Sequence, residues 1–138
     1  MIDKVLKDME IRFPLLELVR EQHNYLHIKV EKASATDAIL MAKTGLGFKT
    51  LQLISTVDRI EDNLFQITWI LENYETASIL LISADFPREG CIVPSLSEIW
   101  PSASAFEREI FEMFGISFPG IINFIRSFIR DNLIHRVR

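Results

Sequence analysis

The sequence predicts an α+β domain of two layers, in which helices pack on one face of a mostly antiparallel or mixed sheet. Nearly half of the 138 residues are hydrophobic (49%) and a quarter are charged (25%), which is ample for one packed core. Helical and strand-like hydrophobic patterns both occur along the chain. Successive strand-like runs are joined by short polar connections, which favour antiparallel neighbours.

The N-terminal part predicts a helix followed by a hairpin. Apolar residues recur at helical spacing from Ile2 to Met9 with charged residues between them, and the pattern ends at Phe13–Pro14. Residues 15–20 fit either the start of a second helix or a strand. Residues 24–30 alternate apolar and polar side chains, which is typical of a strand, so we favour a hairpin connected by residues 21–24.

The middle of the sequence predicts a second helix. Residues 38–43 contain good helix formers, Ser34 or Thr36 is suited to the N-cap, and Gly45 or Gly47 is suited to close the helix.

Three strand-like runs follow this helix, at residues 48–57, 63–71 and 76–83. In the second run, the alternate residues from Phe65 to Leu71 are all apolar and share one face. The polar residues between the runs are typical of turns.

The charge and hydropathy patterns exclude several classes of protein. The net charge of −4 gives no basic field for a nucleic acid, and no nucleic-acid-reading motif is present. The N-terminus is charged at once and has no apolar core of a signal peptide. The longest uncharged stretch, Met113 to Ile125, is shorter than the roughly 20 apolar residues of a membrane span. We therefore expect no nucleic-acid partner and no membrane crossing by this protein alone.

The inventory of reactive side chains predicts no catalytic residue, cofactor or metal. Cys91 is the single cysteine, and an iron–sulfur cluster needs several thiolates. The histidines His23, His27 and His135 have no zinc-ligand pattern, and we expect ordinary surface or edge histidines. Neither a GxGxxG nor a GxxxxGK[ST] motif occurs.

Residues 94–119 carry the most information. Ser95 with Glu98, and Ser104 with Glu107, have the spacing of capping boxes. An apolar stripe follows at helical spacing, with most of the charged residues expected off it, and its members are Phe106, Ile110, Met113 and Phe114. Arg108 and Glu112 are spaced for an ion pair over one turn. The residues alone therefore predict an amphipathic helix with a solvated acidic face, closed by Gly115.

This segment resembles the signature of the thirty-kilodalton subunit of respiratory complex I, the NADH dehydrogenase. The matching positions are Pro94, Ser95, Ile99, Trp100, Ala103, Phe106, Glu107, Arg108, Glu109, Phe111, Glu112, Met113, Gly115, Ile116 and Phe118. A weaker resemblance runs upstream through residues 51–58. The sequence departs from the family pattern at Glu112, where the family usually has Asp, and after Pro119, where no Gly-His-Pro follows. These departures favour a hydrogenase-type or archaeal relative.

The resemblance implies a subunit without a redox centre. It implies residues 1–120 as one α+β domain of this type, in the peripheral arm of a complex I-like or membrane-bound hydrogenase-type enzyme. It also implies docking against a protein like the large subunit of nickel–iron hydrogenase, beside other peripheral-arm subunits on the cytoplasmic side of the membrane. The expected docking or structural residues are Trp100, Phe106, Glu107, Arg108, Glu109, Glu112 and Gly115.

Residues 121–138 are expected to form an amphipathic helical tail, because apolar residues recur there at helical spacing among several arginines. Three roles remain open for the tail: packing on its own domain, docking to a partner, or lying on a membrane surface. Its apolar content predicts self-association of the isolated protein.

Two alternatives to the subunit role also remain open. One is a free-standing interaction module of other ancestry. The other is a small enzyme that uses Asp58, Glu107 or Cys91, for which a nucleophilic cysteine would need a neighbour that lowers its pKa.

Overall fold

The structure is a computed structural model that describes residues 2–120 of the protein. The polypeptide divides into two compact units, Met1–Glu89 and Gly90–Arg138, here called the N-terminal and C-terminal units. This division after Glu89 was not predicted from the sequence. The predicted boundary after residue 120 and the predicted tail stay predictions, because residues 121–138 lie outside the described residues.

The N-terminal unit contains two helices and five strands, which confirms the predicted α+β class. The helices are α1 (Ile2–Arg12) and α2 (Ala35–Gly45), and the strands are β1 (Glu17–Gln22), β2 (Tyr25–Lys29), β3 (Thr50–Arg59), β4 (Leu64–Asn73) and β5 (Ser78–Pro87). The ambiguous residues 15–20 thus contribute a strand, and the predicted hairpin forms with a two-residue turn, residues 23–24.

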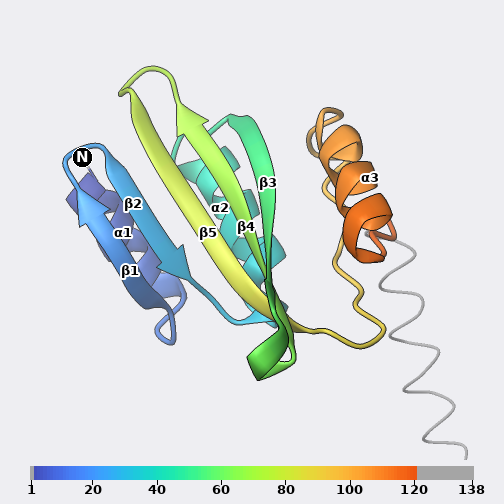
Figure 1. Ribbon diagram of the computed structural model, residues 1–138. Helices are drawn as coiled ribbons and strands as arrows, with labels where there is room; N and C mark the ends of the chain where they lie inside the picture. The colour runs from blue at the N-terminus through green and yellow to red at the C-terminus, as the bar shows by residue number, and fades with distance from the viewer. Residues whose placement is uncertain (1, 121–138) are drawn as a thin grey trace, which may run out of the picture. The chain divides into compact units, whose positions relative to one another are not determined.

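The sheet is mixed, with the strand order β1-β2-β5-β4-β3. Strands β3, β4 and β5 form an antiparallel meander, β1 pairs antiparallel with β2, and β2 pairs parallel with β5. Helices α1 and α2 lie on the same side of this sheet (Figure 1). The predicted layer of helices on one face is therefore confirmed for this unit.

The core lies between the helices and the sheet, and strand periodicity selects its members. On β4 the alternate residues Phe65, Ile67, Trp69 and Leu71 are buried, as their spacing predicted. Trp69 packs edge-on against Phe86 of β5, with 6.3 Å between the ring centroids. The other fully buried large side chains of this unit come mainly from the two helices and the central strands: Met9, Leu26, Ile28, Ile39, Phe48, Leu80 and Ile82.

Some predicted boundaries and caps differ in the structure. Ser34 stands at the N-cap of α2, but its side chain makes no capping hydrogen bond, because a 3-10 turn (Lys32–Ser34) runs directly into the helix. Strand β5 continues to Pro87, past the predicted end at residue 83, since Ala84 and Phe86 still point into the core. Lys29 forms an ion pair with Asp85 across this extension at 2.6 Å.

Candidate functional site

The predicted signature segment forms the described part of the C-terminal unit. Residues 91–95 and 115–119 lie side by side: Val93 N–H donates to Ser117 O (2.9 Å), and Ser95 N–H donates to Pro119 O (2.9 Å). Ile92 and Ser117 form a parallel bridge. Between these two stretches the polypeptide forms helix α3 (Ala103–Phe114), which is therefore attached at both ends to one short ladder.

Helix α3 ends as the sequence predicted but starts differently. Gly115 adopts the left-handed conformation (φ 74°), and its N–H donates to Phe111 O at 2.8 Å. A glycine is favoured there because it has no Cβ to strain a positive φ. The predicted capping box of Ser104 and Glu107 is wrong: the Ser104 hydroxyl donates to Pro101 O, and Glu107 is engaged elsewhere.

Glu107 is a buried charged residue in this unit, with 5% of its surface exposed. Its Oε1 accepts a hydrogen bond from the Ser95 hydroxyl at 2.6 Å, and its Oε2 accepts one from the Leu96 N–H at 2.8 Å. The Ser95 Oγ in turn accepts from the Ser97 N–H. Glu107 therefore connects α3 to the segment that precedes it, whereas the sequence placed it on a solvated face.

The buried face of α3 differs from the predicted apolar stripe. Its buried residues are Ala103, Glu107 and Ile110, while Phe106 and Phe114 are half-buried. Met113 was expected inside but is 76% exposed. The helix is rotated relative to the prediction, and the hydrogen bonds from Ser95 and Leu96 offset part of the cost of burying Glu107.

Of the other predicted site residues, two stabilise the fold of the unit and three carry charges that face the solvent. Trp100 is buried and Gly115 closes the helix, so both serve the fold of the unit. Arg108, Glu109 and Glu112 are exposed. The predicted ion pair between Arg108 and Glu112 is not among the ion pairs of residues 2–120. The three outward charges are therefore accessible to another molecule.

Burial makes the stability of the C-terminal unit depend on pH through Glu107. Removal from water raises the pKa of Glu107 above the ordinary value of 4.5, against the hydrogen bonds from Ser95 and Leu96 that lower it. The folded state thus holds this proton more tightly than the unfolded state. The contribution to stability is full below pH 4.5 and is lost as the pH rises through the folded pKa.

We therefore expect Glu107→Gln to remove this component of the pH dependence. Unfolding by urea, measured at several pH values from 4 upward, would show a flatter stability profile for the variant. Glu109→Gln on the exposed face of the same helix is the matched control and should keep the wild-type profile. An unchanged slope in Glu107→Gln would contradict the assignment.

Each residue of the alternative enzyme is hydrogen-bonded or buried within its own unit. Asp58 accepts two hydrogen bonds from Arg88, at 2.8 and 3.0 Å, and this pairing lowers the pKa of its carboxyl group. Cys91 is buried, and Glu107 is occupied by Ser95 and Leu96. Asp58 belongs to the N-terminal unit, and the other two belong to the C-terminal unit.

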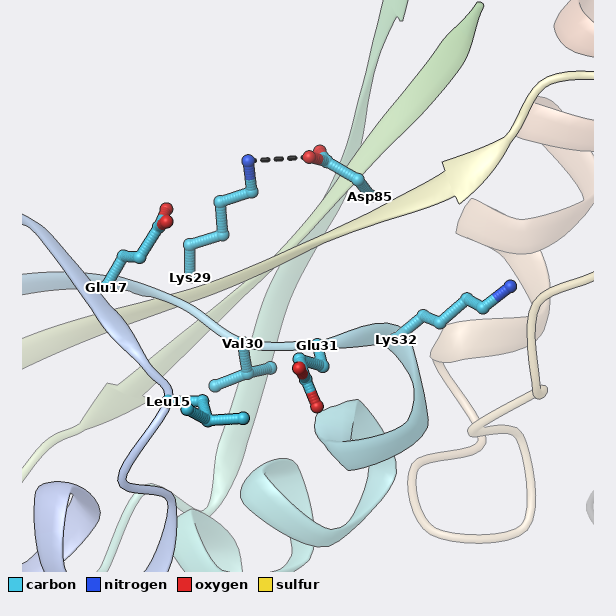
Figure 2. A pocket seen from close by; sticks show the side chains of 7 residues that line it. All are labelled: Leu15, Glu17, Lys29, Val30, Glu31, Lys32 and Asp85. Atoms are coloured by element: carbon cyan, nitrogen blue, oxygen red, sulfur yellow. Dashed lines mark ion pairs between the residues drawn. The ribbon is translucent and has the colours of Figure 1, made fainter.

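A shallow recess of about 250 Å³ lies in the N-terminal unit, where β2 ends (Figure 2). Lys29 and Asp85, which form the ion pair already described, lie on one side of it. The rest of the lining is Leu15, Glu17, Val30, Glu31 and Lys32. Two lysines and three carboxylates balance most of each other's charge, and no serine, cysteine or histidine of residues 2–120 lines the recess, so it has the character of a solvated charged surface.

A hydrogen-bonded polar row was missed by sequence reasoning. His27 Nε2 lies 2.7 Å from Ser83 Oγ, and Ser83 Oγ lies 2.6 Å from Thr68 Oγ1, so the row crosses β2, β5 and β4. His27 was expected at the surface or at a sheet edge, but it is half-buried on an inner strand, and burial lowers its pKa. In the sequence, His27, Thr68 and Ser83 stand as polar residues within three separate strand-like runs. Which of them bond to one another depends on the order of the strands in the sheet.

Neither a metal-binding cluster nor a membrane-spanning helix occurs in residues 2–120. No group of three or more His, Cys, Asp or Glu side chains in this range is arranged to hold a metal ion. None of the helices in the same range has the length and apolar content that a membrane crossing requires.

Known proteins with similar sequences are named as subunits of NADH-quinone oxidoreductase. The protein is 28% identical over 130 residues to the C/D subunit of the NADH-quinone oxidoreductase of Hydrogenobaculum sp., covering 94% of this sequence and 22% of that one. It is 27% identical to the C subunit of the same enzyme in Moorella thermoacetica, covering 96% of this sequence and 89% of the relative. With the C subunit of Ruegeria sp. it shares 37% identity, over 71% of this sequence and 50% of that one.

Solved structures share the fold. A component of the archaeal membrane-bound sulfane sulfur reductase matches with a TM-score of 0.77 and 21% identity, over 86% of this protein and 70% of that component. The trypsin-resistant fragment of Nqo5 matches with a TM-score of 0.76 and 20% identity, over 86% of this protein and 96% of the fragment. These matches confirm the α+β fold.

The family assignment rests on most of the sequence. Residues 26–136 match the family described as the 30 kDa subunit of respiratory-chain NADH dehydrogenase. The match includes the whole signature segment and its buried Glu107. This protein therefore belongs to the family of the 30 kDa subunit of respiratory-chain NADH dehydrogenase.

Proposed function

We propose that this protein is a non-catalytic, cofactor-free subunit in the peripheral arm of a complex I-like NADH:quinone oxidoreductase or a membrane-bound hydrogenase-type complex. The observation that carries the proposal is the contrast between the two faces of α3. Glu107 points inward and fixes the helix to residues 95–96, while Arg108, Glu109 and Glu112 point outward. A helix fixed from inside and charged outside is suited to docking.

The partner we propose is the protein of the complex that resembles the hydrogenase large subunit. Support comes from relatives named as combined C/D subunits, in Hydrogenobaculum sp. and Pseudomonas fluorescens. This protein spans only 22% and 9% of their lengths, so the region similar to it is joined to a larger part within one polypeptide. The sulfane sulfur reductase match supports use of the same fold in a respiratory membrane complex of another kind. We place the subunit on the cytoplasmic side, held at the membrane through the complex.

The side chains available as metal or cluster ligands support the proposal of a cofactor-free subunit. The single cysteine, Cys91, is buried, and an iron–sulfur cluster or a structural zinc site needs several thiolate or imidazole ligands. The charges of the recess beside Lys29 and Asp85 are largely balanced by one another. The chemistry of the complex therefore falls to other subunits, and this protein contributes shape and contacts.

The test is co-purification from native membranes. The tagged full-length protein, expressed in its own organism, is recovered after mild solubilisation, and its companions are identified by mass spectrometry. The expected result is a hydrogenase-large-subunit-like protein in stoichiometric amount. The isolated protein should show neither metal nor visible absorbance, and it should self-associate. Recovery without such a companion, or with a stoichiometric cofactor, would refute the proposal.

The outward charge of Arg108 gives a sharper test of docking. From the sequence, loss of the Arg108 charge is expected to impair either folding or assembly, and the exposure of Arg108 in the structure favours assembly. We therefore expect Arg108→Ala to leave the free energy of unfolding within about 0.5 kcal/mol of wild type. In the complex, the variant should dissociate at lower salt concentration, because peripheral charges govern association and its salt dependence. Lys4→Ala, on the exposed side of α1, is the control.

A further inference from the structure

We infer that Phe111 and Met113 are the apolar anchors of α3, and that the partner subunit receives the helix in a groove with apolar walls and a charged floor. This inference rests on the proposed docking function and assigns the surface that performs it. The docking or structural residues that the family resemblance implied include Phe106 and four charged residues of α3, but neither Phe111 nor Met113. We assign the main energetic role to two apolar side chains on opposite borders of the exposed face of α3.

The exposure of these two side chains is the first observation. Phe111 is 54% exposed and Met113 is 76% exposed, although both stand on a regular helix that has a buried face. Large apolar side chains in water forgo the burial that would stabilise them. Aromatic residues and methionine are also enriched at protein interfaces relative to the remaining surface.

The second observation is that α3 is held in place before any partner binds. Ala103 and Ile110 form the buried face of the helix together with Glu107, which accepts hydrogen bonds from Ser95 and Leu96. Gly115 closes the C-terminal end with a hydrogen bond to Phe111 O. The anchors thus stand on a preorganised element, which lowers the entropy lost on binding.

The geometry of the helix defines the groove. With about 100° of rotation per residue, Phe111 and Met113 fall on opposite borders of the exposed half. Arg108, Glu109 and Glu112 lie between them. A flat surface on the partner could contact only one of these two side chains at a time. A groove reaches both, with apolar walls against Phe111 and Met113, an acidic group facing Arg108, and basic groups facing the two glutamates.

The charges of this face also select a protein partner over a membrane. One arginine and two glutamates give a slightly acidic surface, whereas binding to anionic lipid uses a basic one. Mixed charges between two apolar anchors match the usual pattern of a protein interface, in which the charges set the orientation.

The experiment compares paired variants in the native complex. Phe111→Ser, Met113→Ser and the double variant are tagged and recovered from native membranes as the full-length protein. The matched controls, of similar exposure in the N-terminal unit, are Val19→Ser (51%) and Ile11→Ser (81%). The double variant should retain about tenfold less partner than wild type, as expected for truncated hot-spot residues. Both controls should retain wild-type amounts. Urea unfolding should show that every variant is folded.

The outcomes separate the inference from the proposed function. If wild type recovers no hydrogenase-like partner, the docking function itself fails. If wild type recovers the partner and the double variant recovers as much, the anchors are wrongly assigned. Equal losses in Val19→Ser or Ile11→Ser would also overturn the inference, since the effect would then not belong to α3. A change only in self-association of the isolated protein, with normal recovery of partner, would overturn it as well.

Discussion

Replacement of Glu107 with alanine is expected to lower the free energy of unfolding of the C-terminal unit by about 3 kcal/mol. Truncation leaves the buried Leu96 N–H without its acceptor, at a cost of about 1–3 kcal/mol. It also removes the stronger of the two bonds of the Ser95 hydroxyl, which keeps Ser97 Oγ as an acceptor. It also leaves a void beneath α3. Trp100 is the only tryptophan left in a Trp69→Phe background, so its fluorescence during urea unfolding follows this unit.

Glu107→Gln separates these causes. Glutamine fills the same volume, can accept from the Leu96 N–H and can donate to Ser95 Oγ, so it should cost far less than alanine. Glu109→Ala on the exposed face should stay within about 0.5 kcal/mol of wild type. Equal losses in the alanine and glutamine variants would mean that the negative charge itself, and not hydrogen bonding and volume, stabilises the unit.

Replacement of Trp69 with alanine is expected to destabilise the N-terminal unit by about 3–5 kcal/mol. The indole is 2% exposed in the middle of the sheet and packs edge-on against Phe86. Its removal creates a large cavity between the sheet and its helices. Circular dichroism during thermal unfolding would record the loss, and Tyr74→Ala, at an exposed position (67%), is the control.

Trp69→Phe should cost much less than the change in volume suggests. The Trp69 Nε1–H is buried and has no hydrogen-bond partner in residues 2–120, which disfavours the wild-type side chain. Phenylalanine removes that donor while it keeps most of the apolar contact with Phe86. A loss in Trp69→Phe as large as in Trp69→Ala would contradict this account.

Local patterns in the sequence predicted much of the N-terminal unit. Alternation from Phe65 to Leu71 identified both the strand β4 and its buried face, because strand side chains have a strict period of two. Helical spacing from Ile2 to Met9 identified α1. Strand order was out of reach, since the parallel pairing of β2 with β5 joins residues far apart in sequence.

The candidate site was predicted less well for a physical reason. Hydrophobic periodicity assumes that charged residues face water, so it put Glu107 outside and Met113 inside. A carboxylate can be buried at low cost only if hydrogen-bond donors surround it. Here the donors are the Ser95 hydroxyl and the Leu96 N–H, which lie 12 and 11 residues before Glu107 in the sequence. Position within the signature marked Glu107 as important, but only three-dimensional proximity explains why.

The strand order also has a consequence during synthesis of the protein. The meander from β3 to β5 closes through short connections, whereas β2 must wait for β5, because Tyr25 pairs with Ile79. A lone two-stranded hairpin is only marginally stable in water. Strands β1 and β2 are synthesised before β5, so Leu26 and Ile28 lack their partners Leu80 and Ile82 until translation passes the end of β5.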